Sequence, residues 1–135
     1  MQSFWNKIAI MALHNNIGKL GEVAVAEQLR AEGFTVIATN WRMNHLEIDI
    51  IATKGDTIAF VEVKTRTVNG MDPLDGMTAR KVSLLCRAAE TFIKINRIAL
   101  NPRFDVAAVT VADDHDQAPQ ITYYPDAFTP PLRSY

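Results

Sequence analysis

The sequence has almost no cysteine, no long hydrophobic run and no excess of charge of either sign. Its one cysteine, Cys86, cannot form a disulfide within the chain, which favours a reducing, cytoplasmic setting. No apolar stretch approaches the roughly 20 residues that a membrane-spanning helix needs, so we expect no membrane partner. The first segment, Met1 to Leu13, has one lysine and no clear cleavage site, so it is a poor signal peptide.

The near-neutral charge excludes a strongly basic nucleic-acid-binding protein. The chain has 14 lysines and arginines against 15 aspartates and glutamates, a formal net charge of −1. Any binding of phosphate groups must therefore come from a local basic patch. A hydrophobic content of 48% in 135 residues is enough for one folded core. We expect a single domain over 1–135, with 1–14 as an N-terminal extension and 125–135 as an irregular tail.

Hydrophobic periodicity and turn residues predict two helices and five strands. The helices are expected over Asn15–Glu32, before Gly33, and from an N-cap at Thr78 to about Asn96. The strands are expected at Phe34–Trp41, His45–Thr53, Thr57–Thr65, Arg103–Val111 and Gln120–Tyr124. Loops are expected at Val68–Met77 and Asp113–Pro119.

The order of these elements predicts an α/β fold. The short turn Lys54–Gly55–Asp56 favours an antiparallel hairpin between the second and third strands. The helix between the third and fourth strands implies a right-handed crossover connection. The order α-β-β-β-α-β-β therefore predicts a mixed β-sheet with helices packed against it.

Acidic side chains interrupt the hydrophobic second strand. Alternation along a strand places Glu47 and Asp49 on one face, with Ile48 and Ile50 on the other. Charges among β-branched residues are costly to bury without partners, so their presence indicates a site. Glu47 is equally well placed to join that site through a water molecule or to face solvent at the start of the strand.

The third strand carries a second charged pair. Glu62 and Lys64 share one face, opposite Val61 and Val63. Taken alone, Glu62 and Lys64 would be explained by a solvated ion pair on an edge strand. Asp49 on the neighbouring strand favours a site instead, because clustered carboxylates repel one another and a hard cation relieves that repulsion.

The predicted site is one for Mg²⁺ or Mn²⁺, which take oxygen ligands. Asp49 and Glu62 are the expected carboxylate ligands, and the carbonyl of Val63 could add a further oxygen. Lys64 would orient or activate the attacking water, or stabilise charge that develops on the phosphoryl oxygens. This set predicts metal-dependent phosphodiester chemistry.

The first helix contributes a further acidic residue. Glu22 falls on the same helical face as three apolar residues, Val25, Ala26 and Leu29. It therefore lies within or at the edge of the core-facing stripe, and it joins the candidate catalytic residues. Gly18, one turn earlier, would let another backbone approach this face closely.

Basic residues near the second helix would supply the local patch that the neutral total requires. Arg80 and Lys81 open that helix, whose N-terminal N–H groups also favour anions. With Lys64 and Arg66, they are candidates for binding the phosphates of DNA. Arg80 and Lys81 could equally well be solvated residues of the helix with no role in binding. The sequence does not choose between these interpretations.

Other polar residues have simpler explanations. Arg103 and Asp105 are expected only to pair with each other or to cap the fourth strand. His45 is expected on the surface, because the spacing of the histidines fits no zinc motif. Cys86 lies in the apolar stripe of the second helix and is expected to be a core residue rather than a nucleophile.

Several motifs between Gly18 and Val111 point together to a known family. They are Gly18-Lys19-Leu20-Gly21-Glu22, Asn40-Trp41-Arg42, Glu47-Ile48-Asp49, Phe60-Val61-Glu62-Val63-Lys64-Thr65-Arg66, Arg80-Lys81 and Arg103-Phe104-Asp105-Val106. By these motifs the chain resembles the YraN-type family of largely uncharacterised bacterial proteins. Their fold is that of restriction endonucleases and archaeal Holliday-junction resolvases, the PD-(D/E)xK superfamily.

The resemblance implies a role for each acidic residue. Asp49 takes the place of the first acidic residue, Glu62 and Lys64 form the (D/E)xK pair, and Glu22 is similar to a glutamate that resolvase-like members carry on a helix. Leu46 stands where the family usually has glycine, which affects local geometry more than chemistry. The resemblance implies a Mg²⁺- or Mn²⁺-dependent endonuclease acting on DNA, including branched or structured DNA. Resolvase-like enzymes often act as dimers, so it also suggests a homodimer, although no residue identifies a dimer face.

Two other kinds of function fit the same residues. A nucleic-acid-binding or partner-binding module would have kept the site and lost efficient catalysis, which the neutral charge and small size favour. In a purely structural protein, the carboxylates would only pair with Lys64 and Arg66. Binding of Mn²⁺ and cleavage of DNA separate these alternatives.

Overall fold

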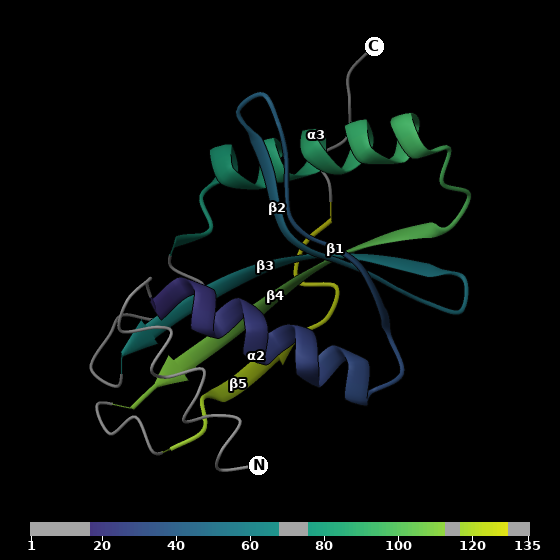
Figure 1. The fold of residues 1–135 in the computed structure, drawn as a ribbon. Helices are drawn as coiled ribbons and strands as arrows, with labels where there is room; N and C mark the ends of the chain where they lie inside the picture. Colours follow the sequence, from purple (N-terminus) through teal and green to yellow (C-terminus); the bar gives the residue numbers. More distant parts are fainter. Residues whose placement is uncertain (1–16, 68–75, 113–116, 130–135) are drawn as a thin grey trace.

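In a computed structural model, five strands form one sheet with helices packed against it (Figure 1). The structure describes residues 17–67, 76–112 and 117–129. In chain order the elements are α2 (Ile17–Ala31), β1 (Thr35–Met43), β2 (Leu46–Lys54), β3 (Thr57–Thr67), α3 (Ala79–Asn96), β4 (Asn101–Val111) and β5 (Gln120–Tyr124). The predicted α/β fold and its order of elements are confirmed. Expectations for 1–16, 68–75, 113–116 and 130–135 lie outside the described residues.

The strands follow one another across the sheet in chain order, from β1 to β5. Three neighbouring pairs are antiparallel, and β3 and β4, which α3 connects, are parallel. This confirms the predicted hairpin between β2 and β3 and the crossover between β3 and β4. β3 is paired on both sides through Val61. Glu62 and Lys64 lie beyond the last pair with β2, where β3 pairs with β4 alone.

Two hydrophobic clusters join the helices to opposite faces of the sheet. The cluster under α2 includes four fully buried side chains from helix and sheet, Leu29, Ile50, Val61 and Val109. The cluster under α3 includes five buried side chains, Ile48, Phe60, Leu85, Phe92 and Phe104. Each fully buried side chain of this size contributes about 1.5–3 kcal/mol, so this burial fixes both helices relative to the strands.

The start of α3 is confirmed where the sequence predicts it. The Oγ1 atom of Thr78 accepts a hydrogen bond from the backbone N–H of Lys81 at 3.2 Å. This cap fixes the first turn of α3, which carries Arg80 and Lys81. Cys86 is buried, as expected. Neither α2 nor α3 is long and apolar enough to cross a membrane.

The alternation expected along β2 is wrong in one respect. Ile50 packs in the cluster under α2, whereas Ile48 packs in the cluster under α3, so these side chains do not share a face. On the neighbouring β1, Thr39 pairs with Ile50 and Trp41 pairs with Ile48. Between them, Asn40 has a left-handed backbone with φ of 50°. A left-handed residue breaks the regular alternation of a strand, and the faces change at this point.

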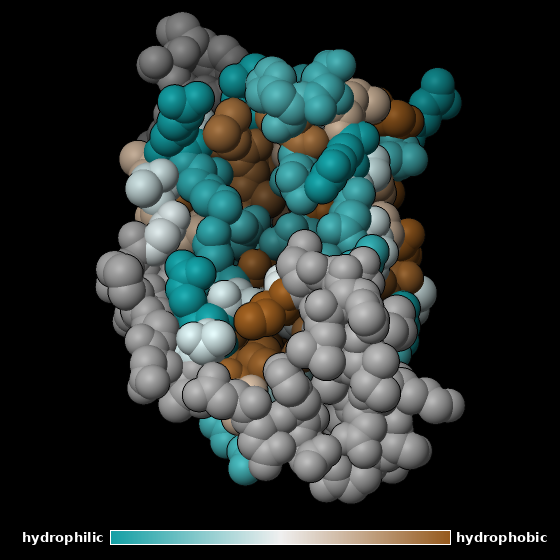
Figure 2. Space-filling view, turned by 60° about the vertical axis from the view of Figure 1, so that its left-hand side comes forward, coloured by the Kyte–Doolittle hydropathy of each residue, from teal (hydrophilic) through white to brown (hydrophobic). Residues whose placement is uncertain are grey.

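Figure 2 views the molecule from the side on which β3 ends and α3 begins. Hydrophobic side chains (brown) lie there between groups of hydrophilic ones (teal). This side of the fold also brings the second half of β3 close to the first turn of α3, the two segments that carry Glu62 and Lys81.

Candidate metal centre

The backbone ladder between β2 and β3 ends directly before the acidic residues. Its last pair is Ile50 with Val61. Beyond that pair, the backbone N–H of Val63 donates a hydrogen bond to Oδ2 of Asp49 at 2.8 Å. A side-chain carboxylate thus takes the place of a backbone partner, at the position where the two strands stop pairing.

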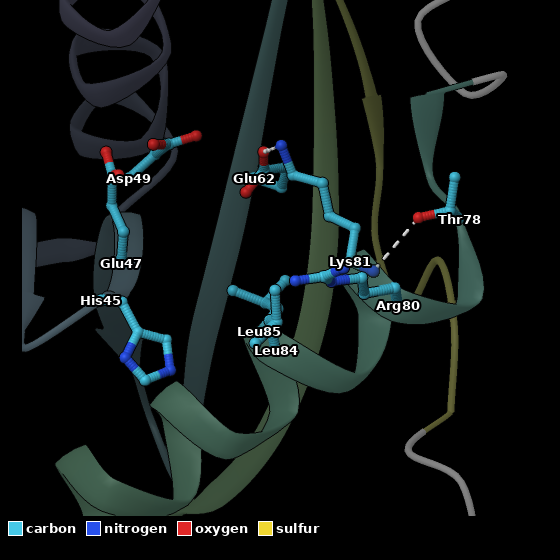
Figure 3. A pocket seen from close by; sticks show the side chains of 9 residues that line it. All are labelled: His45, Glu47, Asp49, Glu62, Thr78, Arg80, Lys81, Leu84 and Leu85. Carbon is cyan, nitrogen blue, oxygen red and sulfur yellow. Dashed lines mark hydrogen bonds and ion pairs between the residues drawn. The ribbon is translucent and has the colours of Figure 1, made fainter.

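A pocket of about 320 Å³ lies beside this end of the ladder (Figure 3). Its charged lining residues are Glu47, Asp49, Glu62, Arg80 and Lys81. The others are His45, Thr78, Leu84 and Leu85. In Figure 3 the acidic side chains project from β2 and β3, and the basic side chains come from the first turn of α3. The predicted metal ligands and the residues predicted to bind phosphate therefore line the same pocket.

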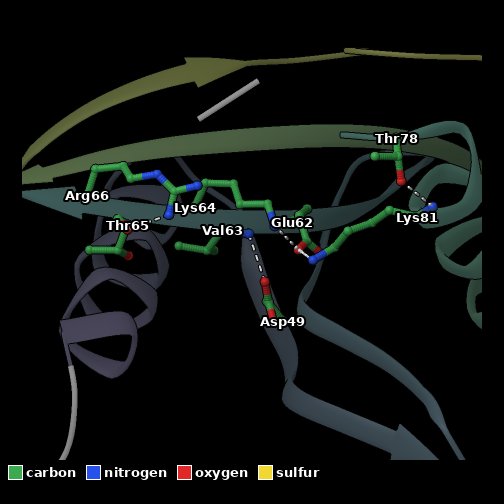
Figure 4. A network of polar contacts seen from close by, with 8 residues as sticks. All are labelled: Asp49, Glu62, Val63, Lys64, Thr65, Arg66, Thr78 and Lys81. Carbon is green, nitrogen blue, oxygen red and sulfur yellow. Dashed lines mark hydrogen bonds and ion pairs between the residues drawn. The ribbon is translucent and has the colours of Figure 1, made fainter. Parts of the chain in front are cut away.

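Glu62 lies at the centre of a network of charged contacts (Figure 4). It is buried, with 7% of its surface exposed. Its Oε1 atom lies 3.4 Å from Nζ of Lys64 and 3.0 Å from Nζ of Lys81. Burial, with a contribution from Lys81, holds the pKa of Lys64 below its ordinary value of 10.5. Glu62 is thus buried and Lys64 partly buried, so they are not a solvated surface pair.

Asp49 lies in surroundings that disfavour its negative charge. Burial and then the carboxylate of Glu62 raise the pKa of Asp49 from 3.8 to about 7, against the opposing effect of the hydrogen bond from Val63. Glu22 and Glu47 act in the same direction as Glu62. A divalent cation would neutralise this accumulated negative charge, so the donor set fits a hard cation with oxygen ligands.

The carboxylates come from α2, β2 and β3 and do not converge on one point. Within residues 17–67, 76–112 and 117–129, no three His, Cys, Asp or Glu side chains are grouped so that they could hold one ion together. Mg²⁺ needs fewer protein ligands, because it commonly binds one or two carboxylates with water and substrate phosphate oxygens. Asp49 and Glu62 are the residues that could hold it here. The role of the Val63 carbonyl stays a prediction.

Glu22 approaches these residues from α2 and does not line their pocket. It lines a second pocket, of about 240 Å³, which it shares with Asn40. Burial raises the pKa of Glu22, although a hydrogen bond from the side chain of Asn40 opposes the shift. The charge of Glu62 raises it further. Glu22 is therefore close enough to the predicted ligand Glu62 for the charge of Glu62 to raise the pKa of Glu22.

A close contact between α2 and β3 sets the position of Glu22. A Cβ atom on its neighbour Gly21 would lie 1.9 Å from Oγ1 of Thr65, so the helix can approach the strand only with glycine there. Among the described side chains, the Thr65 hydroxyl is the one buried polar group with no hydrogen-bond partner. Gly18, where a close approach of another backbone is expected from the sequence, is instead exposed. The close contact is at Gly21 and is made by a side chain.

The basic residues predicted to bind phosphate occupy different places. Arg80 and Lys81 both line the pocket, and Lys81 contacts Glu62 directly. Arg66 lies outside the lining of this pocket, and its guanidinium donates to the carbonyl of Thr65 at 3.4 Å. The sequence does not predict the contact between Lys81 and Glu62, because a lysine in the first turn of a helix gives no indication of its partner.

Glu47 and His45 are exposed residues at the pocket. Glu47 is 3.5 Å from the guanidinium of Arg42, with both side chains largely in solvent. Glu47 faces solvent and lines the pocket. A role at the metal through a water molecule stays a prediction. His45 is on the surface, as expected, and its place in the pocket lining is new.

Asp105 forms a separate buried network on β4. It is 0% exposed, and Nε and Nη2 of Arg103 each donate to its carboxylate at 2.9 Å. The Tyr123 hydroxyl also donates to Asp105, and the backbone N–H of Asp126 donates at 2.9 Å. The expected pairing of Arg103 with Asp105 is confirmed. These bonds tie β5 and the following turn to β4, which is a structural role.

Comparisons with known proteins connect these residues to a family. The sequence profile of the uncharacterised protein family UPF0102 matches residues 21–109. A UPF0102 protein of Oleidesulfovibrio alaskensis is 44% identical over 99 residues, which cover 72% of this chain and 49% of that protein. Another, from Flavobacterium psychrophilum, is 40% identical over 100 residues, covering 73% and 84%. A third, from Bacteroides thetaiotaomicron, is 36% identical over 123 residues, covering 90% and 99%.

Proposed function

The chain belongs to the UPF0102 family, and we propose that it is a Mg²⁺- or Mn²⁺-dependent DNA endonuclease of the PD-(D/E)xK type. Branched or structured DNA is the proposed substrate class. The observation that carries this proposal is the meeting of Asp49 with the Glu62–Lys64 pair at the end of the β2–β3 ladder, beside a pocket with basic residues on its other side.

Asp49 and Glu62 are the proposed ligands, with the Val63 carbonyl as a further oxygen. A bound Mg²⁺ or Mn²⁺ would supply Lewis-acid activation of the phosphodiester and of a water molecule. The raised pKa of Asp49 means that the metal-free carboxyl group keeps its proton up to about neutral pH. Binding of the cation would release that proton, which links ion affinity to pH.

Lys64 is the proposed residue beside the reacting water. Its side chain is 15% exposed and its ammonium group is 3.4 Å from Glu62, so it is held next to a proposed ligand. In hydrolysis, the water oxygen forms a bond to phosphorus and gives up a proton to solvent. The bond to the leaving oxygen breaks, and that oxygen takes up a proton from solvent. Lys64 would orient that water or stabilise the charge that develops on the phosphoryl oxygens. Glu22 would act from the α2 side as an auxiliary carboxylate.

Substrate binding is assigned to the local positive charge around the pocket. Arg80 and Lys81 at the start of α3, with Arg66 on β3, are the proposed phosphate contacts. With a net charge of −1, the molecule has no general attraction for DNA, so affinity would depend on these few contacts and fall steeply with salt. A homodimer is proposed for substrates in which two strands are cut.

The proposal is tested by cleavage of end-labelled DNA: duplex, single strand, flap and four-way junction, each in Mg²⁺, Mn²⁺ or EDTA. The wild type should cut at least one substrate in the presence of metal. Asp49→Ala, Glu62→Ala and Lys64→Ala should each lower the rate by at least about 100-fold. Lys54→Ala, which removes a lysine at the opposite end of β2, is the control and should cut normally. Cleavage that persists in Asp49→Ala and Glu62→Ala would overturn the assignment.

A binding module without catalysis is the second candidate. It is favoured by the two lysines that contact Glu62, because they compete with a cation for this carboxylate. Such a protein would shift branched DNA in a gel and cut none of the panel with any metal. A purely structural role, in which the carboxylates only pair with lysine and arginine, predicts neither DNA binding nor a rise in Tm with Mn²⁺.

A further inference from the structure

We propose that Lys81 is a mobile cation of the site: it contacts Glu62 in the metal-free protein, and it moves onto a phosphate of the substrate when a divalent ion binds. This inference rests on the proposed function, because it assumes an ion at Glu62. It adds an order to binding, in which occupation of the metal site releases a residue that holds the DNA.

The first observation is that two ammonium groups share one carboxylate oxygen. Nζ of Lys81 is 3.0 Å from Oε1 of Glu62, and Nζ of Lys64 is 3.4 Å from the same atom. One carboxylate can neutralise only one of these charges. The two ammonium groups therefore compete for this oxygen and repel each other, while the nearby charge of Asp49 also attracts Lys81.

The second observation is that the two lysines differ in their freedom to leave. The side chain of Lys64 is 15% exposed and projects from the central strand, whereas that of Lys81 is 42% exposed. Water can therefore compete for the ammonium group of Lys81, although Glu62 itself is buried. The long flexible stem of Lys81 is anchored at the first turn of α3, where Thr78 holds its backbone N–H. Lys81 is thus the cation that can move.

The third observation is that Lys81 blocks a proposed ligand atom. A divalent ion bound to Glu62 would place two further positive charges beside the ammonium of Lys81, and both would compete for the carboxylate. Moving Lys81 away removes the repulsion. Lys81 lines the same pocket as Arg80, so after leaving Glu62 its ammonium stays at the pocket, where the substrate phosphate would lie.

The consequence is a positive coupling between ion and DNA. Each ligand favours the arrangement in which Lys81 has left Glu62, so each should tighten the binding of the other by the same factor. Without the Lys81 ammonium, the ion would have no internal competitor and the DNA would lose one contact. The inference therefore predicts that removing the charge of Lys81 strengthens binding of the ion and weakens binding of the DNA.

The test measures the Kd of Mn²⁺ for the full chain without DNA, by electron paramagnetic resonance of the free ion. Lys81→Met keeps the length and apolar stem of the side chain and removes its charge. Arg80→Met is the matched control, since Arg80 is the neighbouring residue and lines the same pocket. Lys81→Met should bind Mn²⁺ about tenfold more tightly than the wild type, and Arg80→Met within about threefold of it. Thermal unfolding checks that both variants fold.

A second measurement uses a fluorescent DNA duplex in Ca²⁺ and in EDTA. The wild type should bind the duplex more tightly in Ca²⁺, and Lys81→Met should lose most of that gain. The role of Lys81 would be overturned if wild type, Lys81→Met and Arg80→Met bound Mn²⁺ with equal affinity. It would also be overturned if Lys81→Met and Arg80→Met both bound Mn²⁺ more tightly than the wild type by the same factor. Either result would leave the metal site intact. Failure of the wild type and both variants to bind Mn²⁺ would overturn the proposed metal site itself, and this inference with it.

Discussion

The backbone N–H of Val63 donates a hydrogen bond of 2.8 Å to Oδ2 of Asp49, just beyond the last backbone pair of β2 and β3. This bond ties one proposed ligand to the strand that carries the other, because Val63 lies between Glu62 and Lys64 in sequence. The distance between the two carboxylates is therefore set by the fold, before any ion or substrate arrives. Such preorganisation is what a site for phosphodiester chemistry needs.

The acidity of Asp49 predicts how the stability of the metal-free protein changes with pH. Folding raises its pKa from 3.8 to about 7. Between these values the folded chain keeps a proton that the unfolded chain releases, so the free energy of unfolding should fall as pH rises from about 4 to about 7. Urea unfolding in EDTA at several pH values measures this slope.

Asp49→Asn is the matched control, because the new amide still offers an acceptor for the N–H of Val63 and has no proton to lose. It should show a smaller pH slope and unfold with about 1–2 kcal/mol more free energy than the wild type at pH 7.5. A slope that is the same in both proteins would show that Asp49 does not titrate in this range.

The contact between Gly21 and Thr65 predicts a non-additive pair of substitutions. Gly21→Ala would place a Cβ atom 1.9 Å from Oγ1 of Thr65, and such overpacking costs about 1–3 kcal/mol of stability. Thr65→Ala removes that oxygen, whose hydroxyl has no partner. The double variant should therefore be more stable than the sum of the single effects predicts, by about 1 kcal/mol in urea unfolding. Strictly additive effects would contradict the close approach of α2 to β3.

The network around Asp105 predicts a large loss of stability without a change in ion binding. Asp105→Ala would leave the guanidinium of Arg103 and the hydroxyl of Tyr123 without their partner, at a cost of about 3–5 kcal/mol. Glu47→Ala removes the exposed pair with Arg42 and should change stability by less than about 1 kcal/mol. Comparable effects of the two substitutions in thermal unfolding would refute the structural role of Asp105.

Lys64→Met is expected to separate ion binding from catalysis. The substitution removes a positive charge beside Glu62, so Mn²⁺ should bind at least as tightly as to the wild type. DNA cleavage should nevertheless fall by at least about 100-fold, because the reacting water loses its charged neighbour. Calorimetry and single-turnover cleavage measure the two effects. Loss of Mn²⁺ binding in this variant would instead assign Lys64 to the positioning of Glu62.

Local patterns in the sequence predict most of the fold, because caps and strand alternation act over a few residues. The bounds of β5, Gln120–Tyr124, and the cap at Thr78 agree with the prediction. The ends of strands differ where pairing with another strand decides them. β1 continues to Met43 because that residue pairs with Leu46. β4 begins at Asn101, before the predicted start, because it pairs with the first residue of β3.

In the candidate site too, local patterns predict some features, and contacts between elements decide the others. Glu62 and Lys64 could be placed on one face because β3 alternates regularly. The opposite faces of Ile48 and Ile50 could not be predicted, because they accompany the left-handed backbone of Asn40 on the neighbouring strand. The contact of Lys81 with Glu62 depends on how α3 packs against the sheet, which no local pattern specifies.

The most direct measurement of the proposed metal site is anomalous X-ray diffraction from crystals grown with Mn²⁺ at about pH 8. The predicted result is a peak roughly 2.0–2.3 Å from carboxylate oxygens of both Asp49 and Glu62, with the ammonium of Lys81 no longer in contact with Glu62. Crystals that hold Mn²⁺ only elsewhere, or that show no peak between these two residues, would contradict a metal centre at the end of the β2–β3 ladder.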